Sequence, residues 1–233
     1  MKKKVTLAFA AFALLLNLSF ESSAQLSEEV VKKTPELPGE IVLDFGFNML
    51  TGKPDYWNQV HWWRSKSVAL YFIKPFDLSK KVEFRPGIGV SLEKIGSKNG
   101  NFLGEMYEDV DDDWDYKKGQ YAINYIEIPL EMRFNFMGND KKSSPYIGLG
   151  GMFAYIFDSH TKVKYSESGD TRKIKEKGDL GMTDLRIGLQ ARIGMGSVNV
   201  FYKYYMTPMF TDKGPVDTQD IMYSTVGISI SGL

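Results

Sequence analysis

The sequence predicts an all-β fold, an eight-stranded antiparallel up-and-down β-barrel that is exported and crosses a membrane with its strands. Three observations predict it. An export signal opens the chain, a period of two in apolar residues dominates from Gly39 onward, and long connections alternate with short ones. Transmembrane barrels combine such strands with short turns on one side and long loops on the other.

The first residues have the composition of a cleavable signal peptide. Residues 1–4 are basic, residues 5–20 are apolar, and small residues precede a predicted cleavage after Ala24. The apolar run is short for a membrane-spanning helix, which needs about 20 apolar residues. We expect residues 1–24 to be the signal peptide, 25–38 a flexible periplasmic leader and 39–233 the barrel domain.

The composition excludes several classes of protein. The chain has no cysteine, so neither disulfides nor lipoprotein processing are available to it. Its net charge is zero, which gives no argument for a nucleic-acid partner. After residue 24 no apolar run approaches the length of a transmembrane helix. The mature chain is therefore either soluble or crosses the membrane as strands.

Alternation of apolar and polar residues marks the strands. It is clearest in residues 82–93, 125–136 and 185–193, and weaker in 40–48, 67–75, 145–157, 197–206 and 221–232. The polar faces mix Glu and Arg with Gly, which suits a narrow lumen: glycine leaves room, and opposite charges satisfy one another. A soluble β-domain that hides its apolar face in a core is the alternative.

The connections and aromatic residues predict an orientation. Residues 77–81, 137–144 and 194–196 are short connections, and residues 49–66, 94–120, 158–178 and 207–220 are long. Short turns face the periplasm, so both termini are predicted to lie there. Aromatic girdles are expected at both rims of the barrel. The outer rim is predicted to carry Trp62, Trp63, Tyr155, Phe157, Tyr204 and Tyr223, and the inner, periplasmic rim Phe76, Phe84, Phe134, Phe136 and Tyr146.

One strand resembles a known family. Tyr125-Ile-Glu-Ile-Pro-Leu130 is similar to a strand of the PorT-like outer-membrane β-barrel family, and residues 145–151, 184–188 and 202–205 resemble further strands. The resemblance covers residues 39–233 and implies a barrel in the outer membrane of a Gram-negative cell. It implies no substrate, although a few members are linked to secretion or surface assembly. The chain departs from the usual C-terminal aromatic residue, because it ends in Leu233.

Pro129 of this strand has no N–H to donate, and a closed barrel has no free edge. We therefore expect a β-bulge at Pro129.

The inward charges are the main candidate site. The predicted network contains Glu83, Arg85, Glu93, Glu127, Glu131, Arg133, Asp184, Arg186 and Arg192, with Asp44 and Lys203 as further members. Arg85 with Glu131 is the preferred cross-strand pair. A selectivity filter is one interpretation of the network. A side-chain plug is favoured, since the interior of an eight-stranded barrel is just filled by side chains.

Other candidate sites are weaker. Asp109, Asp111 and Asp113 match the first, third and fifth ligands of an EF-hand loop, but Trp114 and Gln120 replace the required Gly and Glu. A solvated acidic loop is favoured over weak divalent-cation binding. His61 and His160 are too isolated to predict a zinc site, and Ser65 near His61 does not specify a triad. No cofactor, metal or catalytic residue is expected.

The sequence thus predicts a non-enzymatic barrel for surface interaction or for assembly and secretion. A narrow solute pore and an outer-loop lipid-modifying enzyme are the alternatives. The expected partners are outer-membrane lipid, lipopolysaccharide and other envelope or secretion proteins, with no nucleic acid.

Overall fold

The computed structural model describes residues 39–58, 60–97, 115–137, 144–167, 170–178, 180–215 and 217–232. The predicted signal peptide and leader lie outside them. The strands of the described part are β1 (Glu40–Thr51), β2 (Lys66–Ile73), β3 (Phe76–Asp77), β4 (Val82–Ser97), β5 (Asp115–Asn135), β6 (Pro145–Glu167), β7 (Asp170–Lys177), β8 (Leu185–Met195), β9 (Val198–Tyr205) and β10 (Met222–Ser231). Two short 3-10 turns, η1 (Asp55–Trp57) and η2 (Trp62–Arg64), follow β1. None of the helical turns in these ranges is long and apolar enough to span a membrane.

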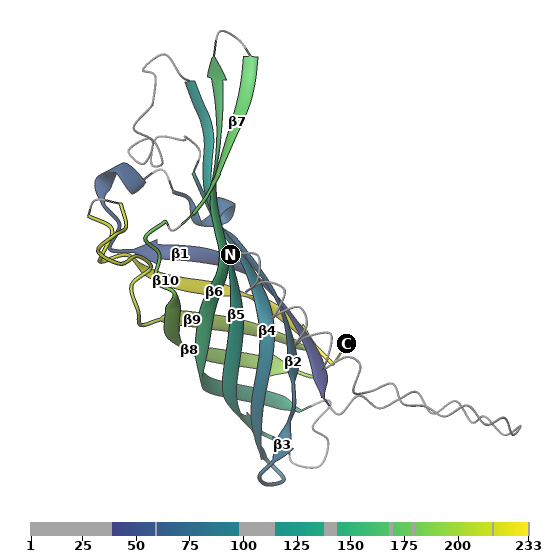
Figure 1. Cartoon of the computed structure of the whole chain (residues 1–233). Helices are drawn as coiled ribbons and strands as arrows, with labels where there is room; N and C mark the ends of the chain where they lie inside the picture. Colours follow the sequence, from purple (N-terminus) through teal and green to yellow (C-terminus); the bar gives the residue numbers. More distant parts are fainter. Residues whose placement is uncertain are drawn as a thin grey trace, which may run out of the picture. The chain divides into compact units, whose positions relative to one another are not determined.

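The antiparallel sheet closes on itself (Figure 1). Its order is β2-β1-β10-β9-β8-β6-β5-β4, and the pairing of β2 with β4 joins the two ends. The predicted fold class, an all-β antiparallel barrel, is confirmed, and every predicted strand segment overlaps one strand of this ring. Two described strands were not predicted: β3 is a two-residue pair with β4, and β7 pairs with β6 outside the ring.

Short connections define one end of the ring, which we call the turn end. There β8 and β9 join through Gly196-Ser197, since Met195 pairs directly with Val198. Gly196 has a φ of 61°, the positive value that a two-residue hairpin turn needs. The amide of Gly232 donates to the carbonyl of Ile41 over 3.1 Å at the same end. The opposite end, which carries η1, η2 and β7, is the loop end.

Alternate residues of the ring strands point outward and form an apolar belt. A membrane barrel requires the apolar residues of the alternating segments 82–93, 125–136 and 185–193 to point outward, and of these Ile88, Val90, Ile128, Ile187 and Leu189 are exposed and Leu130 is half-exposed. The phase of β8 is clear, because Leu189 is 53% exposed and the adjacent Gln190 only 5%. The predicted outward orientation is confirmed. Exposing this belt of apolar side chains to water would be unfavourable, whereas contact with lipid tails is favourable.

Glycine at an inward position makes room for a charged side chain. A Cβ added to Gly148 would lie 2.7 Å from the carboxyl carbon of Glu131, which directly crosses the space in front of it. Gly151 has the outward phase of β6, and the nearest atom to its added Cβ is 3.8 Å away. Gly148 therefore shows the predicted use of glycine to clear the lumen, and Gly151 serves as an outward comparison.

Pro129 fits into β5 without the predicted bulge. The register between β4 and β5 is the same on both sides of Pro129, and only the pairing next to it is interrupted. Proline lacks the N–H that this pairing needs, but the strand does not have to shift. The bulge of this region lies in β6, where Phe157 is an extra residue opposite Asn124 and Tyr125.

A three-stranded extension continues past the ring at the loop end (Figure 1). It consists of the first residues of β5, the last residues of β6, and β7. The predictions of loops over 94–120 and 158–178 were therefore wrong for 94–97, where β4 continues, and for 115–120, 158–167 and 170–177. Nearly all of β7 is exposed, so no alternating apolar pattern in the sequence marks it.

The predicted aromatic girdles are correct only in part. Trp62, Trp63, Tyr155 and Phe157 are exposed near the loop end, as expected. Tyr146 and Tyr223 were predicted at the rims, but they are buried, with exposures of 1% and 0%. Their strand phase points them inward, and each lies against an arginine in the lumen.

Candidate functional site: the side-chain-filled lumen

The candidate site is the lumen, lined by inward residues of the ring strands. The structure places these predicted charges there, each at most 8% exposed: Glu83, Arg85, Glu93, Glu127, Glu131, Arg133, Arg186 and Arg192. Asp44 and Lys203 join them. The assignment of Asp184 was wrong, because it precedes β8 and is exposed. The carbonyl of Asp184 accepts a hydrogen bond from the amide of Ile156.

At the turn end, two arginines share a group of carboxylates. Arg85 contacts Glu40 at 2.5 Å and Glu83 at 3.1 Å. Its distance to Glu131, the partner preferred from the sequence, is longer at 3.8 Å. Arg133 approaches Glu131 at 3.3 Å. The cross-strand register is as the sequence suggested, with Arg85 directly opposite Glu131, but Glu40 at the start of β1 is a closer partner.

In the middle of the lumen, Asp44 and Arg192 form a two-pronged pair. Both terminal nitrogens of Arg192 donate to Asp44, over 2.9 and 2.7 Å, and its Nε lies 3.1 Å from Glu131. β1 and β8 are separated in the ring by β9 and β10. The pair therefore crosses the lumen. Bidentate arginine–carboxylate contacts are among the strongest and most directional in proteins.

The next layer centres on Glu127. Its carboxylate accepts hydrogen bonds from the hydroxyls of Tyr71 and Tyr205, the latter over 2.9 Å. Lys203 donates to Tyr71 over 2.5 Å and lies 3.2 Å from Asp44. Each of these groups is nearly inaccessible to solvent. A buried carboxylate requires such partners, because an unpaired charge is costly in a poorly hydrated interior.

Nearer the loop end, Arg186 is enclosed by rings. One terminal nitrogen donates to Glu93 over 2.9 Å. The guanidinium carbon lies 3.9 Å from the ring centre of Tyr125, 3.8 Å from that of Tyr205 and 4.7 Å from that of Tyr223. Two other guanidinium nitrogens have no hydrogen-bond partner. The faces of the aromatic rings stabilise their charge instead.

An apolar cap covers this polar column at the loop end. Trp57 of η1 is fully buried and stacks on Tyr121, with ring centres 5.7 Å apart. Phe210 meets both rings edge-on. Ile95, Ile123, Met209 and Ile221 belong to the same cluster and are fully buried. The loop end of the barrel is thus closed by packed side chains.

A small cavity remains at the turn end of the lumen. This cavity, lined in part by Arg85, Glu131 and Arg192, has a volume of about 10 Å³. A single water molecule needs about 10–15 Å³. Chemically, the lumen holds charge and rings in fixed mutual contact and leaves no room there for a bound organic molecule.

The comparisons with known proteins decide the family. Residues 23–208 match the family model described as "Outer membrane protein beta-barrel domain". The chain belongs to this outer-membrane β-barrel family. The protein is accordingly a β-barrel of the outer membrane, and the apolar belt is its lipid-facing surface. No curated protein matches the sequence.

Solved structures of similar outline are distant. One is Ail, the attachment invasion locus protein of Yersinia pestis, with 13% identity, 84% of this chain and 99% of that chain covered, and a TM-score of 0.36. Another is the N-terminal β-barrel domain of Pseudomonas aeruginosa OprF, with 11% identity, 83% and 97% covered, and a TM-score of 0.28. Neither likeness is close enough to assign a ligand or a role.

The sequence prediction missed the tyrosines of this outer-membrane barrel. Tyr71, Tyr125, Tyr205 and Tyr223 supply much of the volume around Glu127 and Arg186. A signal was available, because Tyr125 shares the strand phase of the charged residues Glu127 and Glu131. This signal was not used, because aromatic residues of barrels were expected at the membrane rims.

The other candidates do not form a site in the described residues. The Ser65 hydroxyl donates to the backbone carbonyl of His61 over 2.9 Å, not to its imidazole. His61 stacks on Trp63. Within the described ranges, no three His, Cys, Asp or Glu residues group closely enough to hold a metal ion. The acidic positions Asp109, Asp111 and Asp113 lie outside those ranges.

His160 belongs to a small cluster at the base of the extension. Its Nδ1 lies 3.3 Å from Asp158, which also accepts a hydrogen bond from Lys177 over 3.2 Å. Burial and the charge of Lys175 lower the pKa of His160 below its ordinary value of 6.5. Burial acts to raise the pKa of Asp158, but Lys177 and His160 together hold it below its ordinary value. The cluster ties β6 to β7.

Proposed function

We propose that this protein is a closed outer-membrane barrel without enzymatic activity, which acts in surface interaction or in assembly and secretion. The filled lumen carries the proposal. Charged pairs occupy it from the turn end to Arg186, and Trp57, Tyr121 and Phe210 cap it. A conducting barrel needs a continuous aqueous path. With the interior occupied, the working surface is the loop end, with its three-stranded extension.

Planar-bilayer recording tests the closed lumen. The refolded protein should insert without steady single-channel steps. A variant that removes lumen-filling groups, Trp57→Ala with Arg186→Ala and Arg192→Ala, should conduct and so show that the assay detects an open barrel. Folding of both proteins is checked by the change in gel mobility on boiling. Steady conductance of the wild-type protein would overturn the closed lumen.

The finer family assignment is also proposed: the chain is PorT-like. The motif Tyr125-x-Glu127-Ile-Pro129-Leu supports it, because its residues have defined positions in the lumen. Tyr125 packs on Arg186, Glu127 is the acceptor of the middle layer, and Pro129 lines the cavity at the turn end. A motif whose side chains organise the interior is a feature of the barrel itself. It supports a shared architecture and not a shared ligand.

The proposed orientation has both termini in the periplasm and the extension outside. The meeting of Gly232 with Ile41 at the turn end supports it, since short turns face the periplasm. Protease added to intact Gram-negative cells should cut the extension and spare a C-terminal tag. Crosslinking in intact cells, followed by identification of co-purified molecules, tests the proposed partners: outer-membrane lipid, lipopolysaccharide and envelope or secretion proteins.

A further inference from the structure

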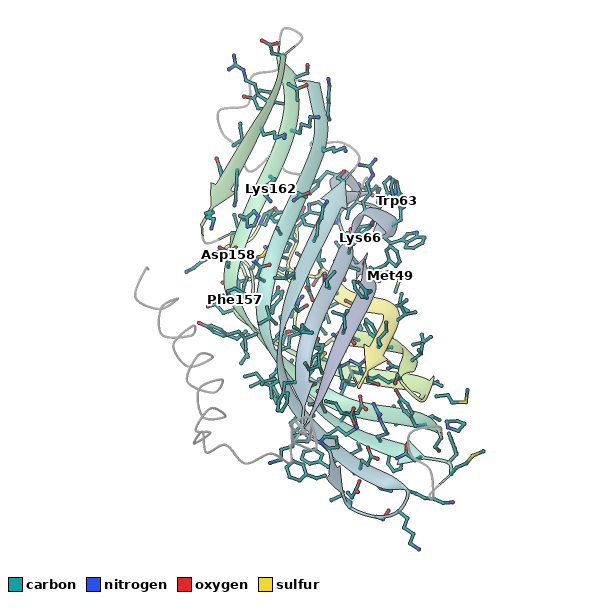
Figure 2. All side chains as sticks on the ribbon, turned by 90° about the vertical axis from the view of Figure 1, so that its right-hand side faces the viewer. Met49, Trp63, Lys66, Phe157, Asp158 and Lys162 are labelled. Carbon is teal, nitrogen blue, oxygen red and sulfur yellow. The ribbon has the colours of Figure 1, made fainter. Side chains whose placement is uncertain are left out.

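A set of lysines lies on the outward side of the barrel wall at the loop end. We call it the lysine face, and it consists of Lys66, Lys94, Lys118, Lys162, Lys164, Lys173 and Lys175. All seven are exposed or half-exposed. Figure 2 shows Lys66 and Lys162 on the part of the ribbon above Phe157. The face draws on five strands, β2, β4, β5, β6 and β7, each of which pairs with the next, so the lysines lie on one continuous part of the wall.

Several of these lysines stand directly opposite one another. Lys66 pairs with Lys94, and Lys118, Lys164 and Lys173 form one row across three strands. Lys162 pairs with Lys175 in the adjacent row. Like charges directly opposite on a sheet are destabilising. Anions bound between the ammonium groups would therefore stabilise these rows.

The chain supplies little compensation within the described ranges. The charge of Lys94 interacts with those of Lys66, Lys118 and Lys162 as well as Arg64, all of the same sign. Asp158, a carboxylate on this side of the extension, is already bonded to Lys177 and His160. Within the described part of the chain, no ion pair joins a carboxylate to the seven lysines.

The position of the lysine face identifies the anion. On β6, the bulge at Phe157 puts Thr161, Val163 and Tyr165 on the buried side, so that Lys162 and Lys164 continue the outward side. Below them, the outward side is the apolar belt, with Leu92 on β4 directly preceding the pair made by Lys94. The lysine face is thus continuous with the lipid-facing surface and not with the lumen.

Aromatic residues mark the height of the membrane boundary. Trp62 and Trp63 are 58% and 48% exposed beside Arg64 and Lys66, and Phe157 is 43% exposed at the base of the extension (Figure 2). Exposed tryptophans of transmembrane barrels lie at the lipid–water interface. Lysine stems extend along apolar surface and bring their ammonium groups to the polar boundary. The seven lysines therefore lie at and just beyond the headgroup level.

We infer that the lysine face binds the phosphate groups of outer-leaflet lipid headgroups, several lipids lying side by side against the wall. This deepens the proposed function and rests on its orientation, with the loop end outside. Charge complementarity and continuity with the apolar belt support a lipid occupant, because a lipid fills both surfaces at once. A soluble anion would fill only the lysine rows.

Tryptophan quenching by brominated lipid tests the inference. The protein, with Trp114→Phe, is refolded in phosphatidylcholine bilayers, so that Trp62 and Trp63 are the exposed reporters while Trp57 stays buried. Brominated phosphatidic acid and brominated phosphatidylcholine are compared at equal mole fraction. We expect an association-constant ratio of about fivefold or more in favour of phosphatidic acid, on the scale of one well-placed lysine.

Two variants with equal loss of charge separate the site from general electrostatics. Lys94→Gln, Lys118→Gln and Lys162→Gln together should bring the ratio close to one. Lys74→Gln, Lys80→Gln and Lys81→Gln, all exposed at the turn end, should leave it unchanged. An equal ratio in wild type and the first variant would overturn the inference. Salt provides a readout without a variant: raising NaCl tenfold should collapse the wild-type ratio, and a salt-insensitive ratio would contradict the site.

Two other occupants are separate outcomes. Loss of the phosphatidic-acid preference in about 10 mM inorganic phosphate at constant ionic strength would mean a soluble-anion site and overturn the lipid assignment. A preference that emerges only after Asp111→Asn, Asp112→Asn and Asp113→Asn would mean that the chain's own acidic segment occupies the lysines. Conductance is measured independently, so an open lumen with an intact lipid preference would refute the closed barrel alone.

Discussion

The ion pair between Arg186 and Glu93 gives the sharpest test of the filled lumen. The guanidinium is fully buried, Glu93 is 3% exposed, and the two lie 2.9 Å apart. Replacing Glu93 with Leu leaves a buried cation, and replacing Arg186 with Met leaves a buried carboxylate. Each single change should lower the free energy of unfolding by about 3–5 kcal/mol, the usual cost of breaking a buried pair.

The double variant Glu93→Leu with Arg186→Met should cost less than the sum of its single changes. It removes both charges, and its remaining cost comes from lost contacts with Tyr125 and Tyr205, each cation–π contact being worth about 1–2 kcal/mol. The coupling energy of the cycle should then be at least about 2 kcal/mol. Urea unfolding in micelles, followed by gel mobility and tryptophan fluorescence, measures all four proteins.

Arg85 and Glu131 provide the matched control cycle. Their closest ion-pair distance is 3.8 Å, and Arg85 has nearer partners in Glu40 and Glu83. Because each residue keeps another partner when the other is removed, their coupling should be below about 1 kcal/mol. A coupling near zero for Glu93 and Arg186 would refute the reasoning, since it would mean that water solvates both charges inside the barrel.

Three further outcomes follow from the structure. Leu189→Arg on the lipid face should lower the free energy of unfolding in bilayers by about 2–4 kcal/mol, with Leu189→Phe nearly neutral; equal costs would contradict the phase of β8. Gly148→Ala should cost about 1–3 kcal/mol by crowding Glu131, whereas Gly151→Ala has room and should cost much less. The folded pKa of His160 is below its ordinary value of 6.5, so protonation favours the opened hairpin, and stability is lost as pH falls through about 6.5. The protection factors of the β6 and β7 amides, which correct for the slower intrinsic exchange at low pH, should therefore fall between pH 7 and pH 5.5, and His160→Gln should remove most of that change.

The ring strands could be predicted from the sequence because each of their two faces meets a different environment, lipid on one side and the lumen on the other. In residues 125–136, lipid selects apolar residues on one side and the crowded lumen selects Glu127, Glu131 and Arg133 on the other. β7 faces water on most of its surface, so neither selection acts and its sequence resembles a charged loop. Alternation therefore predicts the part of a strand that crosses the membrane, but not how far the strand continues into water.

Inward direction could also be predicted, but individual partners could not. The register of Arg85 opposite Glu131 was available from strand order. Glu40 became the nearer partner because a long side chain at the edge of the ring reaches across the narrow lumen. Pro129 shows the same limit. Its missing N–H was evident, but whether the strand bulges or only loses a pairing depends on the packing around it.

The pair between Asp44 and Arg192 has a consequence for the order of folding events. The two residues are 148 positions apart in the sequence and stand on strands that are not neighbours in the ring. Each hairpin can form by itself, but this pair requires the first and last strands to have met already. It belongs to the latest contacts of assembly. Weakening it should therefore leave the folding rate nearly unchanged and speed unfolding, so that the pair acts as a kinetic latch on the closed barrel.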